Sequence, residues 1–339
     1  MYNEEYIRSL VEDDIGSKLE ERLHSKSWPV PDYYCLFEFL KTFFSFITPE
    51  QINNTKVILK CEVPEGDTGD SYLCEIYEGD VTIDNSTVVL YADKTFQLNS
   101  IDYTVNEPAI VYEYKDNKEV FSIGDLVVRP TLYDTTQSSV FSKPTYKGLE
   151  EALRSYYQKR ARCSSCTLLS SSWIDEVRSR FVNAPESKLR DSLWHFLKDT
   201  MRGVEVKREQ NVNETEPVDI KVGWTSPPAV ALIEIKWLGV SVNPKTKTKT
   251  SQYGEERANS GAKQLIDYIC EYHQEDTRRC CLGYHVVFDG RRRNHGNPER
   301  ELIKDELWYY RDSEISYNEE CIKDYSKNYR FYMEPRCPA

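Results

Sequence analysis

The sequence has no long hydrophobic run, because no window of about 18 consecutive apolar residues occurs in it. The most apolar stretch near the N-terminus, residues 43–47, is far too short to span a bilayer. The first residues, Met-Tyr-Asn-Glu-Glu, are acidic and show no signal-peptide pattern. We therefore expect a cytoplasmic protein without a membrane partner. Its 10 cysteines are then expected to be reduced thiols rather than a disulfide framework.

Motifs of several other protein classes are also missing. There is no glycine-rich phosphate loop, so ATP use is not expected. No Ser-His-Asp or Cys-His order, base-reading motif, winged helix or zinc-finger pattern stands out. Cys163 and Cys166 have the CxxC spacing of half a zinc site, and Cys270 and His273 could supply the missing pair of a four-ligand site. Buried thiols are the favoured interpretation, and zinc binding stays open.

What the chain does have is material for a packed core. Of its 339 residues, 39% are hydrophobic and 12% aromatic, with 24 tyrosines, which excludes a disordered chain. This length favours two domains.

The net charge of −12 is unevenly distributed along the chain. Residues 1–150 carry 13 Lys and Arg against 27 Asp and Glu, whereas residues 151–339 carry 31 against 29. The first part is therefore expected to repel nucleic acid, and the second part is able to meet a polyanion.

The first part, residues 1–145, is predicted to be an acidic α+β domain with a β-rich centre. Apolar spacing predicts helices over 4–23 and 33–47. Short runs rich in Val, Ile, Tyr and Thr then predict an antiparallel sheet or small barrel, with strands at 55–61, 71–77, 81–92 and 110–114. The domain ends near Ser142-Lys143-Pro144. We expect it to serve in partner binding, sensing or oligomerisation.

The second part, residues 146–339, is predicted to be α/β. Helical patterns occur at 149–162, 173–182 and 186–201, and the last of these opens after Asn183 and Pro185. Three strands are predicted at 204–209, 216–222 and 230–237, followed by a polar loop at 239–257, a helix at 258–272 and a strand at 282–288. The core order from residue 183 to residue 290 is αβββαβ.

Two acids and a lysine on neighbouring strands suggest chemistry. Alternate residues of a strand share a face, so Glu234 and Lys236 point the same way, and a hairpin can bring Asp219 beside Glu234. Paired carboxylates repel each other in a partly apolar setting, and a divalent cation relieves the repulsion. Lys236 would position or help deprotonate a water bound there. The combination suits metal-assisted phosphodiester hydrolysis.

The order Glu186, Asp219, Glu234-Ile235-Lys236 resembles the PD-(D/E)xK nuclease superfamily, whose restriction-endonuclease-like core is also αβββαβ. The resemblance implies that Asp219 and Glu234 are ligands of Mg²⁺ (or Mn²⁺ in its place), that Glu186 supports them, and that Lys236 is the catalytic lysine.

A second similarity lies on the next predicted helix. Gln264 and Tyr268, four residues apart and so on one helical face, look like the QxxxY element of RecB-like and lambda-exonuclease-like branches, which lies near the active site. The resemblance covers about residues 183–290, and none is recognised for residues 1–145.

Plainer interpretations of these residues stand beside the resemblance. Pro217 is not adjacent to Asp219, although the strict motif has the two side by side. Asp191 could replace Glu186, depending on helix phase, and Glu186 could be only a charge favoured at a helix N-terminus. Glu234 and Lys236 could be an exposed pair, but their strand is apolar almost throughout. Gln264 and Tyr268 could be helix-surface residues.

Basic residues near these acids fit a phosphate backbone, which Lys and Arg bind without reading sequence. Solvated loops are the alternative, above all for the Lys-Thr-Lys-Thr-Lys loop. The candidate contacts are Lys188, Lys207, Arg208, Lys245, Lys247, Lys249, Arg291 and Arg292.

The resulting hypothesis is a Mg²⁺-dependent nuclease that cleaves DNA with water as nucleophile. By analogy with the fold, it would serve bacterial restriction or antiphage defence. The alternatives are an RNase of the same fold and a non-catalytic nucleic-acid-binding or structural subunit of a complex. Sequence specificity, endonuclease or exonuclease action, activator and oligomeric state stay open.

Overall fold

The structure is a computed structural model. It describes residues 4–49, 52, 55–60, 87–91, 96–98, 108–115, 118–130, 139–163, 166–201, 203–210, 217–275 and 280–336. The chain forms two compact units, one of residues 1–147 with 226–228 and one of residues 148–225 with 229–339. The strand predicted at 71–77 and residues 81–86 of the next one lie outside the described residues. No helix in the described ranges is long and apolar enough to cross a membrane.

In its described residues, the first unit combines helices α1 and α2 with a six-stranded sheet in the order β3-β2-β1-β4-β5-β6. The helices are α1 (Glu4–Ser25) and α2 (Tyr33–Phe46), close to the predicted ranges. The strands are β1 (Thr55–Lys60), β2 (Thr87–Tyr91), β3 (Phe96–Leu98), β4 (Ala109–Lys115), β5 (Lys118–Ile123) and β6 (Leu126–Val128). The prediction of an antiparallel sheet is wrong for one pair, since β1 and β2 are parallel. The long segment 61–86 between them permits the crossover that a parallel pair needs.

Aromatic and aliphatic side chains together form the core of the first unit. Helix α2 begins at Tyr33 after Asp32, whose carboxylate accepts a hydrogen bond from the Tyr34 N–H at 3.2 Å. Its rings then reach the sheet: Phe37 lies 5.9 Å from Phe121, centroid to centroid, in an edge-to-face arrangement. The N-terminal unit therefore has a hydrophobic core of its own.

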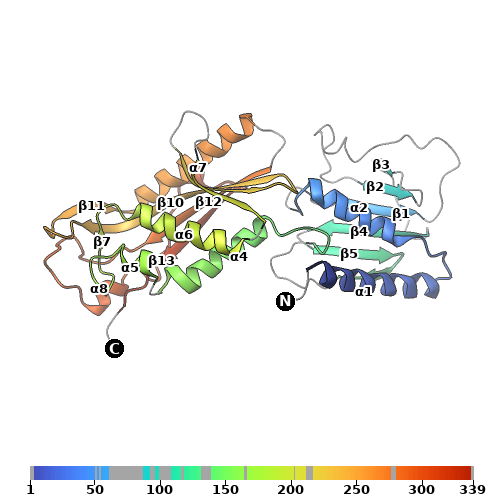
Figure 1. The fold of residues 1–339 in the computed structure, drawn as a ribbon, viewed down its shortest axis with the longest axis horizontal. Coiled ribbons are helices and arrows are strands. Elements are labelled where there is room, and N and C mark those ends of the chain that lie inside the picture. The colour runs from blue at the N-terminus through green and yellow to red at the C-terminus, as the bar shows by residue number, and fades with distance from the viewer. Residues whose placement is uncertain are drawn as a thin grey trace. The chain divides into compact units, whose positions relative to one another are not determined.

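The second unit is built on a seven-stranded sheet in the order β13-β12-β10-β9-β8, with β11 and β7 also paired to β10 (Figure 1). The strands are β7 (Phe181–Val182), β8 (Glu205–Gln210), β9 (Val218–Trp224), β10 (Ala229–Val242), β11 (Lys249–Tyr253), β12 (Cys280–Asp289) and β13 (Ser326–Tyr332). The helices are α4 (Tyr146–Tyr156), which continues as the π-helical turn η2 (Tyr157–Ala161), α5 (Thr167–Ser170), α6 (Glu186–Thr200), α7 (Glu255–Glu275), α8 (Lys304–Trp308) and the 3-10 turn η3 (Glu319–Cys321). The predicted helices near 186–201 and 258–272 and all four predicted strands are confirmed.

Helices cover both faces of this sheet. On one face, Leu265 and Ile269 of α7 pack with Val230 and Leu232 of β10. On the other, Tyr156 of α4 stacks edge-to-face against Phe196 of α6 and Phe288 of β12, at centroid distances of 5.4 and 6.2 Å. Strand β10 is consequently buried along its whole length.

The helix predicted at 173–182 is wrong. This segment is a turn that ends in β7, because local polar contacts replace the helical ladder. Asp175 accepts a hydrogen bond from the Ser179 N–H at 3.0 Å, and Arg178 adopts a left-handed φ of 62°. Trp173 then stacks on Phe181 with ring centroids 4.0 Å apart.

Two further differences concern strands. The predicted loop at 239–257 is largely a hairpin, since β10 continues to Val242 and then turns back into β11. The sequence did not predict β11 because its residues are mostly polar and show no apolar alternation. Strand β13, parallel to β12, was not predicted at all.

Gly239 is required where β10 passes the end of β12. Its φ is +135°, a conformation that other residues rarely adopt, and an added Cβ would lie 2.9 Å from the backbone oxygen of Gly290. Substitution would therefore strain the backbone and also displace the end of β12.

We expect Gly239→Ala to lower the free energy of unfolding of the second unit by about 2 kcal/mol or more. Gly254→Ala is the control, since nothing lies within 4 Å of the added carbon. Urea unfolding followed by tryptophan fluorescence measures both, because every tryptophan except Trp28 lies in the second unit. Equal unfolding midpoints for the two variants would contradict the argument.

Candidate active site

The candidate site lies where strands β9 and β10 separate. Their backbone pairing runs from Ala229 and Trp224 to Ile233 and Ile220 and stops there. Beyond that point the Asp219 carboxylate takes the place of a backbone partner, because its Oδ2 accepts the Ile235 N–H at 2.8 Å. Asp219 is thereby fixed beside β10 and buried, with 6% of its surface exposed.

Glu234 and Lys236 lie on the face of β10 that α7 covers. Val230, Leu232 and Leu238 share that face with them, because every second residue of a strand points the same way. Both charged side chains are buried. The Lys236 ammonium donates to Glu234 Oε1. Glu234 Oε2 is also buried but has no hydrogen-bond partner among the described residues. An unsatisfied carboxylate oxygen is costly in an apolar interior.

The electrostatics of the pair follow from this burial. Burial, reinforced by the charge of Asp219, raises the pKa of Glu234 to about 8. The pKa of Asp219 is also raised, chiefly by burial, although the hydrogen bond from Ile235 opposes the shift. Both carboxyl groups therefore resist ionisation unless positive charge comes close.

Arg190 supplies part of that positive charge. Its guanidinium donates to Asp219 Oδ1 at 3.1 Å from helix α6. Arg190 follows Glu186 by four residues, so both side chains lie on one face of the helix. This spacing is a signal in the sequence that could have identified Arg190 as part of the site.

Of the two candidate helix acids, Glu186 is directed to the pair. Its charge contributes to the raised pKa values of both Asp219 and Glu234, and its Oε2 lies 3.4 Å from a guanidinium nitrogen of Arg257 in α7. Asp191 instead pairs with Arg208 of β8 at 2.7 Å. Five residues separate the two acids, so they lie on different faces of the helix.

Gln264 and Tyr268 form a pair of their own on α7. The Gln264 amide donates to the Tyr268 hydroxyl at 2.6 Å. Tyr268 is 3% exposed and packs in the apolar cluster that includes Val218, the residue before Asp219. The structure thus places Tyr268 in the core beside the site, with the half-buried Gln264 bonded to its hydroxyl.

His285 is a site neighbour that the sequence reasoning missed. It lies directly opposite Glu234 in the parallel pairing of β10 and β12 and has no exposed surface. Only the register of the two strands brings it there, because no motif spacing connects residue 285 with residue 234.

Two carboxylates fit a divalent cation better than they fit an apolar interior. Asp219 and Glu234 are oxygen ligands of the kind Mg²⁺ takes, and the unpartnered Oε2 of Glu234 is available to one. No group of three or more His, Cys, Asp or Glu side chains in the described part of the chain is arranged to hold a metal ion. Cys163 and Cys166, the candidate half of a zinc site, form no disulfide with another described cysteine.

Six of the eight candidate phosphate contacts are described at or near the surface. Lys245, Lys247 and Lys249 are exposed around the turn between β10 and β11. The exposed Lys207 and Arg208 pair with Glu205 and Asp191, and Lys188 donates to the Ser171 carbonyl at 2.7 Å.

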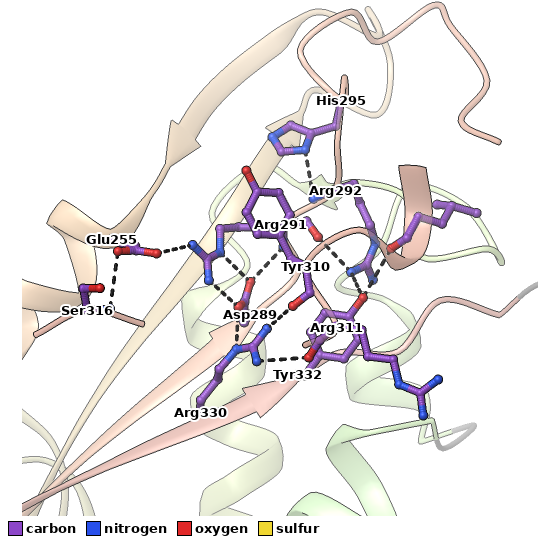
Figure 2. A network of polar contacts seen from close by, with 11 residues as sticks. Glu255, Asp289, Arg291, Arg292, His295, Tyr310, Arg311, Ser316, Arg330 and Tyr332 are labelled. Carbon is purple, nitrogen blue, oxygen red and sulfur yellow. Dashed lines mark hydrogen bonds and ion pairs between the residues drawn. The ribbon is translucent and has the colours of Figure 1, made fainter. Parts of the chain in front are cut away.

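Arg291 and Arg292 are different, because the fold already uses both guanidinium groups (Figure 2). Arg291 donates to both oxygens of the fully buried Asp289, at 3.0 and 2.8 Å, and Arg330 donates to the same carboxylate at 2.8 Å. Arg292 is 1% exposed and donates to backbone carbonyls, among them that of Arg178. These contacts hold the loop after β12 in place and leave neither side chain exposed to a phosphate backbone.

Comparison with known proteins gives no match to a family model, a curated protein or a solved structure. The site is therefore interpreted from its own geometry.

The raised pKa of Glu234 predicts a pH dependence of stability. Between its ordinary value of 4.5 and about 8, the folded protein holds a proton that the unfolded chain releases, so stability falls as the pH rises through that window. Glu234→Gln lacks this penalty. In metal-free buffer we expect similar melting temperatures near pH 4 and a Gln variant that is about 3–5 kcal/mol more stable at pH 9, a difference on the order of 10 °C. A constant difference across the range would contradict the raised pKa.

Removing the Asp289 charge should destabilise the second unit. Although burial opposes it, the hydrogen bonds and charges of Arg291 and Arg330 lower the pKa of Asp289, so its contribution is present above 3.8 and lost as the pH falls further. At pH 7 we expect Asp289→Asn to cost about 3–5 kcal/mol, because two guanidinium groups lose a buried counter-charge. Asp312→Asn, at an exposed position, is the control in the same urea experiment. A cost within 0.5 kcal/mol, about that of a surface substitution, would rule out this role.

Proposed function

We propose that this chain is a metal-dependent nuclease with a site of the PD-(D/E)xK type in a restriction-endonuclease-like core. The observation that carries the proposal is the buried Asp219–Glu234 pair at the separation of β9 and β10, with one oxygen of Glu234 unpartnered and Lys236 beside it. Burial of two like charges is unfavourable, and sites that require it are often functional.

The residues of the chain have distinct roles in this proposal. Asp219 and Glu234 would hold a divalent cation, with Glu186 in support, and such a cation would supply activation of a water and stabilisation of charge on the phosphate. Lys236 orients that water through its ammonium. Arg190 keeps the Asp219 carboxylate directed at the site through its 3.1 Å contact. Gln264 and Tyr268 fix the helix that covers the pair.

DNA is the favoured substrate, and an RNase of the same type is the alternative within this class. The exposed lysines of the β10–β11 turn would contact the phosphate backbone of either polymer without reading its bases. The acidic first unit would bind a protein partner or a second copy. A place in bacterial restriction or antiphage defence remains an analogy with the fold.

One observation favours a non-catalytic subunit as the second candidate. Each carboxylate of the pair already has a cationic neighbour, Arg190 for Asp219 and Lys236 for Glu234. Such a set could be a closed ion-pair cluster that stabilises the fold of a nucleic-acid-binding or structural protein. Activity measurements distinguish the two candidates.

The test is a cleavage assay of the full chain on single- and double-stranded DNA and RNA, with Mg²⁺, Mn²⁺ or EDTA. We expect metal-dependent cleavage, and a loss of about 100-fold or more in Asp219→Asn, Glu234→Gln and Lys236→Met. The matched controls, Glu205→Gln and Lys304→Met at exposed positions, should retain wild-type rates. Cleavage of RNA alone would select the RNase. An inactive wild type would leave the non-catalytic subunit, and activity that survives all three site substitutions would exclude this site as its source.

A further inference from the structure

His285 presents an unused hydrogen-bonding atom to the site. Its Nδ1 lies 3.2 Å from Asn328 Oδ1 and 3.4 Å from the Tyr317 hydroxyl, whereas its Nε2 is buried and has no partner among the described residues. Because an amide oxygen only accepts hydrogen bonds, we assign the ring proton to Nδ1, which then donates a hydrogen bond to Asn328 Oδ1. Nε2 is then left with a lone pair that can accept.

His285 Nε2 and the side chain of Lys236 both border the space above Gly261 of α7. A Cβ at position 261 would lie 2.6 Å from His285 Nε2, 2.5 Å from Lys236 Cγ and 3.0 Å from Lys236 Cε. All three atoms therefore surround one point, which the absence of a side chain at Gly261 keeps open. Since Nδ1 is engaged with Asn328, Nε2 is the ring atom that faces this point and can serve as an acceptor.

The proposed function creates a need for such an acceptor. The ammonium of Lys236 has three N–H donors, and its described partner is Glu234 Oε1. A divalent cation at Oε2 would draw negative charge from the Glu234 carboxylate. Oε1 would then be a weaker hydrogen-bond acceptor for the Lys236 ammonium. A buried ammonium without partners would oppose cation binding.

We infer that His285 is a positioning residue for Lys236, whose ammonium it receives at Nε2 when Glu234 binds a divalent cation. This inference rests on the proposed function. His285 touches neither substrate nor cation in this scheme and acts only through Lys236. Asn328 fixes the tautomer, as partners of active-site histidines commonly do.

The test measures Mn²⁺ affinity by titration calorimetry on the full chain without nucleic acid. We expect His285→Leu to weaken Mn²⁺ binding about tenfold, because Lys236 then competes with the cation for Glu234. His285→Gln retains an accepting oxygen and should stay within about twofold of wild type. In a Lys236→Met background His285→Leu should have no effect, since the group it serves is gone.

His285→Phe keeps a planar ring without an acceptor and carries the same expectation if the Leu variant does not fold. Three results would overturn the inference: wild-type affinity in the non-accepting variants, an equal loss in His285→Gln, or a loss that persists in Lys236→Met. In those cases the nuclease proposal still stands. Failure of the wild type to bind Mn²⁺ more tightly than Glu234→Gln would instead remove the proposed metal site, and the inference with it.

Discussion

The candidate site depends on charged side chains that project from a strand whose residues are all buried. Strand β10 is covered on both faces, yet Glu234 and Lys236 project from it into the layer beneath α7. Ionised groups persist in such a place only when other groups compensate for their lost hydration. Glu234 and Lys236 compensate each other through their hydrogen bond, and the N–H of Ile235 and the guanidinium of Arg190 do the same for the neighbouring Asp219.

Two buried acids in the same unit show opposite behaviour, and their partners explain the difference. Asp289 receives hydrogen bonds from Arg291 and Arg330 at both oxygens, which lower its pKa despite burial. Glu234 has one cationic partner and an acidic neighbour, and its Oε2 has no hydrogen-bond partner among the described residues. Burial and the charge of Asp219 raise its pKa to about 8. The first arrangement is complete and belongs to the architecture, whereas the second is the one to which we assign the cation in the proposed function.

The sequence predicted helices and strands correctly where an apolar period coincided with Pro, Gly or Asn at the ends of the segment. The helix from Glu186 and the strands that carry Asp219 and Glu234 were recognised, because each combines a clear apolar period with Pro, Gly or Asn at its ends. Residues 173–182 have helical spacing too, but Asp175, the left-handed Arg178 and the stack of Trp173 on Phe181 favour a turn. Strands β11 and β13 were missed because most of their residues are polar or only half-buried, so neither shows a clear apolar pattern.

The sequence by itself therefore determined the division of charge, the main elements of the second unit and the identity of the two acids and the lysine, since all three depend on local composition and spacing. Only the tertiary structure showed that Asp191 pairs with Arg208 and so is turned away from the site, unlike Glu186. It also showed that Arg291 and Arg292 are used by the fold. Arg190 and His285 were likewise brought to the site by packing alone. The physical reason is that these outcomes depend on helix phase, on burial and on the register between β10 and β12. Each of these is fixed by packing between segments far apart in the chain, so no short stretch of sequence specifies it.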